Sequence, residues 1–489
     1  MLEAQLIFDR YHATMDQFAS GEHALIGGKP LADLPATFYV SQRKLSFAPC
    51  VGHERLLEGL MRRNIDVPRA RFLREDKAGL SRTAERLAST SNPFLIRCVK
   101  PGTIMFAREP FADITGPFAE TQMMEVRFEH AFDEPMTVAG RALAIRLDAG
   151  ERWISDFSLR RDGSLGRAVD IAKYSYIGGF DDTSNMEAAF LLDINAVGTM
   201  AHYLVQAFLV SSRYPQRSEK GVRKHFQQAC FEQWLDAHPK GTTLLLDTIT
   251  LRLGVIHTIR AAKSSEGRRG ALRAVRIDSG NLIKNALWVR AMLDANALED
   301  VKIILTSDLD RNLIAEIVKR CPAVYGFGVG TKLAAEVENV AGVIFKLSQI
   351  DDLPTLKCSE TPGKETLPGR LQVWRCIDHE GFFVKDVIGT DGWAASEQDR
   401  KEFSSAFPLL QPWWGNAFKT DFLPYEQPRM PTIQEQRVFV QQQVKRFRDI
   451  HNYPVELSSL TKERIRYLTE MMTRDEMGES GVVMVDYPS

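Results

Sequence analysis

A histidine among small and apolar residues is the first place where this sequence could do chemistry. His202 lies in VGTMAHYL (197–204), after a glycine, a threonine and an alanine. Neutral imidazole is a nucleophile near pH 7. A single histidine in apolar surroundings is also a common component of a protein core. From this stretch alone, both interpretations stay open.

Polar residues also follow apolar runs, as they do at ligand-binding strand ends. In VRIDSGN (275–281), Asp278, Ser279 and Gly280 stand between an apolar run and a helix start. The N–H groups of a helix start can hold an anion, and the carboxylate of Asp278 suits ribose hydroxyls. LTSDLDRNLI (305–314) repeats this pattern with Ser307 and Asp308, although those two residues could simply cap a helix.

Two further stretches carry groups that recognise anions. GFGVGTKL (326–333) sets Gly326, Gly328, Gly330 and Thr331 around a strand end. Glycines there let the backbone approach a phosphate closely, or they form a tight turn. DFSLRRDGSLGR (156–167) carries Arg160 and Arg161, whose guanidinium groups could hold a carboxylate or a pyrophosphate. A solvated arginine pair on the surface is the alternative.

The elements that must position these residues alternate between strand and helix. Short apolar runs recur between residues 240 and 350, with amphipathic stretches between them: 243–247, 274–278, 302–306, 324–329 and 342–347. This alternation predicts βαβ units and a parallel sheet. These runs are too few for a full barrel, so further strands are expected from 150–210. The carboxyl ends of such strands bind ligands. The residues alone therefore predict an α/β enzyme that binds a phosphorylated sugar and an anionic partner.

Composition excludes several other classes of protein. The 489 residues carry a net charge of −1, which provides no general field for nucleic acid or an anionic membrane. The six cysteines are scattered without a CxxC pair, which argues against a disulfide framework or a cysteine zinc site. No apolar run is long enough to span a membrane, and the first residues do not have the pattern of a signal peptide. We expect a cytoplasmic protein.

Several of these stretches, in this order along the chain, resemble the nicotinate phosphoribosyltransferase family. DRYHATM (9–15) is similar to the family's opening motif, and EP (109–110) with TGPFAETQMMEV to its next one. DFSLRR, GGFDDTSN and VGTMAH follow, and then LLLDT, RIDSGNL, TSDLD, FGVGTKL, FKL and the closing YPVELS. The order of these motifs carries the resemblance more than any one of them.

The resemblance implies an α/β fold, an irregular barrel of the type II phosphoribosyltransferase kind, with an α+β domain built from both chain ends. We expect an N-terminal domain over 1–150, the barrel with the active site over 151–350, and a C-terminal part over 351–489 that packs with the first. The implied reaction joins nicotinate to phosphoribosyl pyrophosphate and releases nicotinate mononucleotide and pyrophosphate. ATP, Mg²⁺ and a head-to-tail homodimer are also implied.

The resemblance further implies roles for individual residues. His202 matches the histidine that ATP phosphorylates in this family. Phe157 and the partner subunit's Tyr11 match aromatic residues that sandwich the pyridine ring. Arg160 lies at the base or pyrophosphate, Arg276 at the nicotinate carboxylate, and Asp278 at the ribose hydroxyls. The remaining implied substrate contacts are Arg161, Ser184, Ser279, Gly280, Ser307, Gly328, Gly330 and Thr331. No metal ligand is identified.

Two departures from the family pattern leave alternatives open. Asn281 stands where an aspartate is usual, and Asp182 where glycine is common. A degenerate relative that binds a nucleotide without turnover is therefore one alternative. The other is an enzyme that acts on nicotinamide. Ser184 stands where nicotinamide-type relatives carry an aspartate, which favours the acid because a carboxylate there would repel nicotinate.

Overall fold

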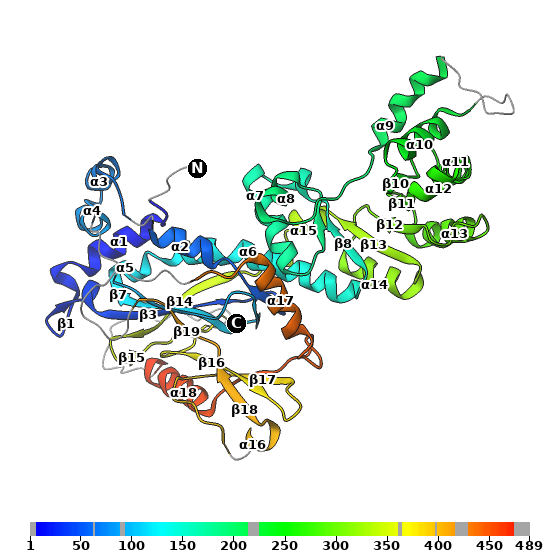
Figure 1. Cartoon of the computed structure of the whole chain (residues 1–489). Coiled ribbons are helices and arrows are strands. Elements are labelled where there is room, and N and C mark those ends of the chain that lie inside the picture. The colour runs from blue at the N-terminus through cyan, green and yellow to red at the C-terminus, as the bar shows by residue number, and fades with distance from the viewer. Residues whose placement is uncertain are drawn as a thin grey trace, which may run out of the picture. The chain divides into compact units, whose positions relative to one another are not determined.

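The computed structural model describes residues 6–61, 64–88, 93–213, 224–359, 364–396, 399–415 and 429–473 (Figure 1). The chain forms two compact units. Unit 1 comprises residues 1–133, 342–430 and 442–489, and unit 2 comprises residues 134–341 and 431–441. Within the described part of the chain, no helix is long and apolar enough to cross a membrane.

Unit 2 is built on one parallel sheet of six strands. Their order is β10-β11-β12-β13-β8-β9, and each neighbouring pair is parallel. The strands are β8 (Trp153–Asp156), β9 (Asp182–Thr183), β10 (Thr242–Leu245), β11 (Leu272–Ile277), β12 (Lys302–Leu305) and β13 (Val324–Val329). Most of their residues are buried, as expected for a parallel sheet covered on both faces.

The fold class expected from the sequence is confirmed, and so is the origin of the extra strands. β8 and β9 lie within residues 150–210 and pair beside β13. The strand expected over 342–347 is present, but its expected place in the parallel sheet is wrong. Residues 342–347 belong to β14 (Val343–Ile350), which pairs antiparallel with β3 (Pro35–Gln42) in unit 1. An apolar run shows that a strand is buried but does not reveal its partner.

Helices connect the strands of unit 2, and several begin at a residue whose side chain caps the first turn. Asn281, Asp310, Ser164 and Thr250 each accept a hydrogen bond from the backbone of the helix that follows. The helices are α7 (Leu165–Ile177), α8 (Met186–Leu192), α9 (His202–Ala207), α10 (Phe226–Ala237), α11 (Leu251–Ala262), α12 (Glu266–Ala271), α13 (Leu282–Asp294), α14 (Arg311–Arg320) and α15 (Thr331–Ala334). α6 (Glu125–Ala149) and α17 (Ile433–Val444) contribute residues to both units.

Unit 1 combines strands from the two ends of the chain. Figure 1 shows blue and cyan strands beside yellow ones, and the largest sheet has the order β15-β14-β3-β7-β5-β19. A second sheet has the order β18-β16-β17-β20, and two pairs, β1-β2 and β4-β6, complete the set. The expected α+β domain made from both chain ends is therefore confirmed.

The remaining elements of unit 1 have the following bounds. The strands are β1 (Leu25–Ile26), β2 (Lys29–Pro30), β4 (Phe47–Cys50), β5 (Leu95–Cys98), β6 (Thr103–Phe106), β7 (Pro110–Pro117), β15 (Leu353–Pro354), β16 (Gln372–Ile377), β17 (Phe383–Gly389), β18 (Ser405–Pro408), β19 (Gln411–Trp414) and β20 (Val455–Leu457). The helices are α1 (Arg10–Ala19), α2 (His53–Met61), α3 (Val67–Arg74), α4 (Ser81–Ala88), α5 (Phe118–Gln122), α16 (Asp399–Glu402) and α18 (Ser459–Thr473).

Candidate active site

A cavity of about 460 Å³ lies where the strands of the parallel sheet end. Its walls come from the residues after β8, β11, β12 and β13, and from the segment that leads into α9. The lining residues are Phe157, Leu159, Arg160, Arg161, Ser184, Gly198, Thr199, Met200, Ala201, Tyr203, Arg276, Asp278, Thr306, Ser307, Asp308, Gly328, Gly330 and Thr331. Ten of the residues expected from the sequence thus surround one cavity.

The residues after β8 form one wall of the cavity. The Phe157 N–H donates to the carbonyl of Val329 at 2.8 Å, which holds the turn against β13. The Phe157 ring lies directly on Gly328, where an added Cβ would approach the ring carbons to 2.6 Å. Glycine is therefore required at 328 for the aromatic ring to lie there. Arg160 and Arg161 follow in a short 3-10 turn and are exposed to solvent.

His202 begins α9 and faces the ends of β10 and β11. Its Nδ1 lies 3.1 Å from the hydroxyl of Thr248, and its Nε2 lies 3.7 Å from Oδ2 of Asp278. The ring is 39% exposed, so it is not a core histidine. When Nδ1–H donates to Thr248, the lone pair stays on Nε2, which is then able to act as a nucleophile.

Asp278 belongs to a network that joins three neighbouring strand ends. Its Oδ1 accepts a hydrogen bond from the Thr306 hydroxyl at 2.6 Å. Its backbone N–H donates to Oδ2 of Asp247 at 3.0 Å, and the Ser279 hydroxyl donates to the same oxygen. The other carboxylate oxygen of Asp247, Oδ1, is buried without a hydrogen-bond partner among the described residues. The carboxylate oxygens of this network can accept hydrogen bonds from the hydroxyls of a ribose.

Arg276 is the best-defined cation of the site. Its Nη1 donates to the Thr199 hydroxyl at 3.1 Å, while its Nε is buried and has no partner among the described residues. Burial lowers the pKa of Arg276, and the carboxylates of Asp278 and Asp247 oppose that shift. The guanidinium remains charged at neutral pH. An unpaired N–H on a buried cation fits an anionic group of a ligand.

The phosphate-type turns differ from one another in what their residues do. Ser307 and Asp308 have positive φ angles of 87° and 42°, and Asp310, not these residues, caps α14. The simple capping interpretation of Ser307 and Asp308 is therefore wrong. Gly326 is not among the residues that line the cavity. It lies directly against β8, where an added Cβ would be 2.4 Å from the Trp153 carbonyl oxygen.

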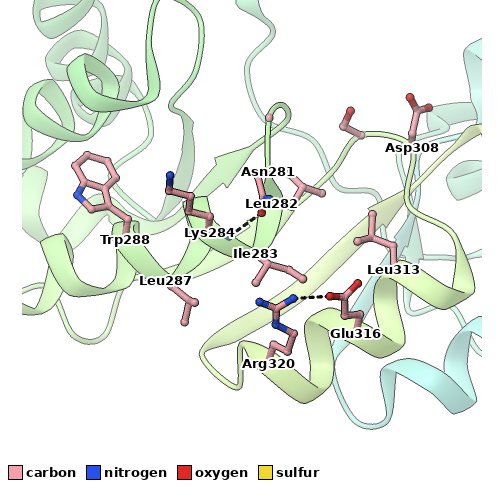
Figure 2. Close-up of a pocket in the computed structure, with 12 residues that line it drawn as sticks. Asn281, Leu282, Ile283, Lys284, Leu287, Trp288, Asp308, Leu313, Glu316 and Arg320 are labelled. Carbon is pink, nitrogen blue, oxygen red and sulfur yellow. Dashed lines mark hydrogen bonds and ion pairs between the residues drawn. The ribbon is translucent and has the colours of Figure 1, made fainter.

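Ser279 and Gly280 lie at the entry to α13, next to a second cavity. The second cavity has a volume of about 970 Å³ and is lined by residues of α13 and α14 (Figure 2). Gly280 lines this cavity, and Ser307 and Asp308 line both cavities. Asn281 also faces it, and its Oδ1 accepts a hydrogen bond from the Lys284 N–H at 3.0 Å. Asparagine caps a helix about as well as aspartate. The departure at 281 thus preserves the start of α13.

Asp182, the other departure, has a structural role on the edge of the sheet. It is buried, and its Oδ2 accepts a hydrogen bond from the Trp153 indole at 2.7 Å. Burial raises the pKa of this carboxyl. Its neighbour Ser184 lines the first cavity.

Tyr11 lies in unit 1, on α1. Its hydroxyl donates to Oε2 of Glu125 at 2.5 Å, and Glu125 also contacts His12 and Lys346. Partial burial and the Glu125 carboxylate raise the pKa of Tyr11, so the phenol stays protonated. The ring itself is 47% exposed. Tyr11 is therefore held by its hydroxyl, and about half of the residue is exposed to solvent.

The sequence analysis missed four polar residues of the site: Asp247, Thr248, Thr306 and Thr199. Asp247 follows the apolar run of β10, so the rule that strand ends carry function would have identified it. Thr306 follows β12 in the same way. Thr199 lies in an irregular segment, and only the structure shows its hydrogen bond to Arg276.

No cluster of three or more histidine, cysteine, aspartate or glutamate side chains arranged for a metal ion occurs among the described residues. Mg²⁺ commonly uses only one or two carboxylates and completes its shell with substrate phosphates and water. Asp278 and the unpartnered oxygen of Asp247 fit that kind of site.

Comparison with known proteins identifies the family. A profile described as the nicotinate phosphoribosyltransferase (NAPRTase) family matches residues 153–365. The nicotinate phosphoribosyltransferase of Bacillus subtilis is 30% identical over 384 residues, which cover 74% of this chain and 74% of that protein. Nicotinate phosphoribosyltransferase pncB2 of Mycobacterium tuberculosis is 36% identical over 293 residues, which cover 60% of this chain but only 58% of that protein.

Solved structures share the fold. The crystal structure of human nicotinic acid phosphoribosyltransferase superposes with a TM-score of 0.71 at 20% identity, and covers 95% of this chain and 100% of that one. A nicotinate-nucleotide pyrophosphorylase from Pyrococcus furiosus superposes with a TM-score of 0.65 at 21% identity, and covers 91% and 96%. The match to the Bacillus relative extends over most of both proteins, and the chain belongs to the nicotinate phosphoribosyltransferase family.

Proposed function

We propose that the protein is a nicotinate phosphoribosyltransferase. In this reaction the ring nitrogen of nicotinate forms a bond to C1 of the ribose as the C1–oxygen bond to pyrophosphate breaks. The observation that carries the proposal is one cavity that joins an aromatic wall, a buried cation with an unpaired N–H, and a carboxylate network at phosphate-type turns.

The cytoplasmic location expected from the sequence stays a prediction.

The base end of the cavity suits an aromatic acid. Phe157 offers a ring face on which a pyridine can stack, and Arg276 offers its unpaired Nε to a carboxylate. Arg160 adds a second positive charge in the same cavity. Ser184 presents a hydroxyl and no negative charge. These charges favour nicotinate over nicotinamide, whose amide lacks the anion that a buried guanidinium requires.

The other end suits a ribose phosphate. Asp278, held by Thr306 and Asp247, would bind the ribose hydroxyls. Backbone at Gly328, Gly330 and Thr331, with Ser279, Gly280 and Ser307 nearby, would hold phosphate oxygens. Arg160 and Arg161 would stabilise the leaving pyrophosphate. Catalysis then consists of positioning and charge stabilisation as C1 develops positive charge.

His202 and the nearby carboxylates are the residues that would use ATP and Mg²⁺. We propose that Nε2 of His202 attacks the γ-phosphorus of ATP, so that a P–N bond forms, a P–O bond breaks and ADP leaves. Water later hydrolyses the phosphohistidine to phosphate. In the tautomer whose Nδ1–H donates to Thr248, the lone pair is on Nε2. Arg160 and Arg161 are cations of the cavity that would meet the added negative charge. Asp278 and Asp247 would hold Mg²⁺, which neutralises phosphate charge.

The alternative of a relative that binds a nucleotide without turnover rests on Asn281. The Asn281 side chain caps α13 and lines the second cavity, not the first. The cap keeps the start of α13 intact, which supports the enzyme over the binder.

The coupling to ATP is tested by replacing His202 with alanine. We expect the wild type to form nicotinate mononucleotide from nicotinate, phosphoribosyl pyrophosphate and Mg²⁺, with a rate that ATP increases. The His202→Ala variant should keep the ATP-independent rate and lose the increase, because the group that accepts the phosphoryl is gone. Product formation and ADP release, measured together, check this. Undiminished ATP stimulation in the variant would refute the phosphohistidine.

We propose in addition that a homodimer completes the site with the partner subunit's Tyr11. Two exposed apolar surfaces support this. α1 exposes Tyr11, Met15 and Phe18 at helical spacing, and α8 exposes Met186 and Phe190. Exposed apolar surfaces of this kind mark interaction sites.

Co-expression of two inactive variants tests the contribution of Tyr11 across subunits. Tyr11→Ala and Arg276→Leu should each be poorly active alone. In mixed dimers, one of the two sites combines an intact Tyr11 with an intact Arg276, so roughly a quarter of the wild-type activity should return. If Tyr11 acts in its own chain's site, no mixed dimer has an intact site and no activity returns.

A further inference from the structure

A buried carboxylate behind the cavity wall joins three segments that line it. Asp156 ends β8 and is 1% exposed. Its Oδ1 accepts a hydrogen bond from the Ser158 N–H at 2.8 Å, and its Oδ2 accepts one from the Thr183 hydroxyl at 2.8 Å. Its backbone carbonyl accepts a hydrogen bond from the Ser184 N–H at 2.9 Å. Asp156 therefore bonds to Ser158, which follows Phe157 in one wall of the cavity. It also bonds to Ser184, which lies in another wall.

Thr183 extends this connection to a third segment. Its hydroxyl accepts a hydrogen bond from the Asn185 N–H at 3.1 Å while it donates to Asp156. Its backbone carbonyl accepts a hydrogen bond from the Val197 N–H at 2.9 Å, just before Gly198 and Thr199 in the cavity wall. β9 is only two residues long. A strand of two residues forms few backbone hydrogen bonds with its neighbour. The hydrogen bond from the Thr183 side chain to Asp156 therefore contributes much to holding β9 in place.

We propose that Asp156 is a positioning residue for the base: through Thr183 and Ser158 it sets the separation between the Phe157 wall and the Ser184 wall. The proposal rests on the proposed function, because it concerns how that reaction's base is bound. Asp156 does not line the cavity. The ribose and phosphate end depends on other residues, namely Asp278, Asp247 and Thr306.

Burial raises the pKa of Asp156, and the hydrogen bonds from Ser158 and Thr183 oppose that rise. Asparagine has nearly the same shape but only one acceptor oxygen. In Asp156→Asn, that oxygen can accept from the Ser158 N–H, and the amide N–H then faces the Thr183 hydroxyl. The hydroxyl already accepts from Asn185, so its own proton loses its partner. Thr183→Val removes the same bond from the other side, together with the acceptor of the Asn185 N–H.

The test compares steady-state kinetics of the wild type, Asp156→Asn, Thr183→Val and the double variant. Each single variant should raise the KM for nicotinate about tenfold, the size expected for one charge-assisted hydrogen bond. The KM for phosphoribosyl pyrophosphate should stay within twofold of wild type. The double variant should be no worse than the worse single variant, because both changes remove the Asp156–Thr183 hydrogen bond.

Asp182→Asn is the matched control. Asp182 precedes Thr183, is also a buried carboxylate, and bonds to the Trp153 indole rather than to the cavity walls. This variant should leave both KM values unchanged. Thr183→Val carries the test by itself if Asp156→Asn does not fold.

Four outcomes would overturn the proposal. In an active enzyme, an unchanged KM for nicotinate, or a parallel rise in both KM values, would leave Asp156 with a structural role only. The same shift in Asp182→Asn would show that any buried charge on this edge has that effect. A wild type that neither turns over nor binds nicotinate by calorimetry would overturn both this proposal and the proposed function.

Discussion

Replacing Arg276 with leucine should lower kcat/KM for nicotinate by about 10²- to 10³-fold. The guanidinium is mostly buried, keeps an unpaired Nε, and stands beside Asp278 and Asp247. Removal of one partner of a buried, hydrogen-bonded charge pair costs about 3–5 kcal/mol, which corresponds to this range or more. The two remaining carboxylates would also repel the acid. Initial rates at several nicotinate concentrations measure the effect.

Arg273→Leu is the control for this result. Arg273 lies on the same strand, β11, but near its other end and exposed to solvent. Its replacement should change kcat/KM by less than about twofold, as expected for a surface position. A loss below tenfold in Arg276→Leu would show that Arg276 does not bind the carboxylate.

The largest loss of stability is expected in unit 1, for Arg375→Met. Arg375 is 1% exposed and forms a forked ion pair with Asp386, and it also donates to the Ile104 carbonyl at 2.8 Å. The Tyr453 hydroxyl donates to the same Asp386 at 2.8 Å. Methionine would leave the Asp386 carboxylate buried without its cation, which costs about 3–5 kcal/mol of unfolding free energy. Urea unfolding followed by fluorescence measures this loss.

Glu109→Gln is the matched variant inside the same cluster. Glu109 is fully buried, and burial next to Asp386 raises its pKa well above the usual range, which favours the neutral acid. Its Oε2 accepts a hydrogen bond from the Phe106 N–H at 2.7 Å, and its Oε1 has no hydrogen-bond partner among the described residues. Glutamine keeps an acceptor for the Phe106 N–H and carries no charge. We expect a change below about 1 kcal/mol. If Arg375→Met destabilised the protein no more than Glu109→Gln, the cluster would not stabilise unit 1 as described.

The strand ends that carry the site were predictable because they follow a physical rule. In a parallel sheet, the carboxyl ends of all strands meet at one edge, so Asp278, Ser307 and Gly328 had to lie near one another. The same rule was not applied to Asp247, although the residue follows an apolar run. His202 could not be assigned from its surroundings, because its partners Thr248 and Asp278 come from distant parts of the chain.

Other parts of the structure left no signal that a sequence pattern could show. β14 was placed in the wrong sheet, since its partner β3 lies some 300 residues earlier. Glu109 and Tyr453 belong to stretches that resemble family motifs, yet both lie in the buried Arg375 cluster rather than in the cavity. Arginine is rarely buried, so no composition rule places it there. Asp156 does not line the cavity, and only the structure shows the hydrogen bonds to Ser158 and Thr183 that connect it to the cavity wall.

The central claim is that this cavity binds an aromatic acid and transfers a phosphoribosyl group to it. The most direct measurement is kcat/KM of the wild type for nicotinate and for nicotinamide, with phosphoribosyl pyrophosphate and Mg²⁺. The unpaired Arg276 Nε and the uncharged Ser184 predict that nicotinate is preferred by at least about 100-fold. Equal use of the two bases, a preference for nicotinamide, or no product with either would contradict the account.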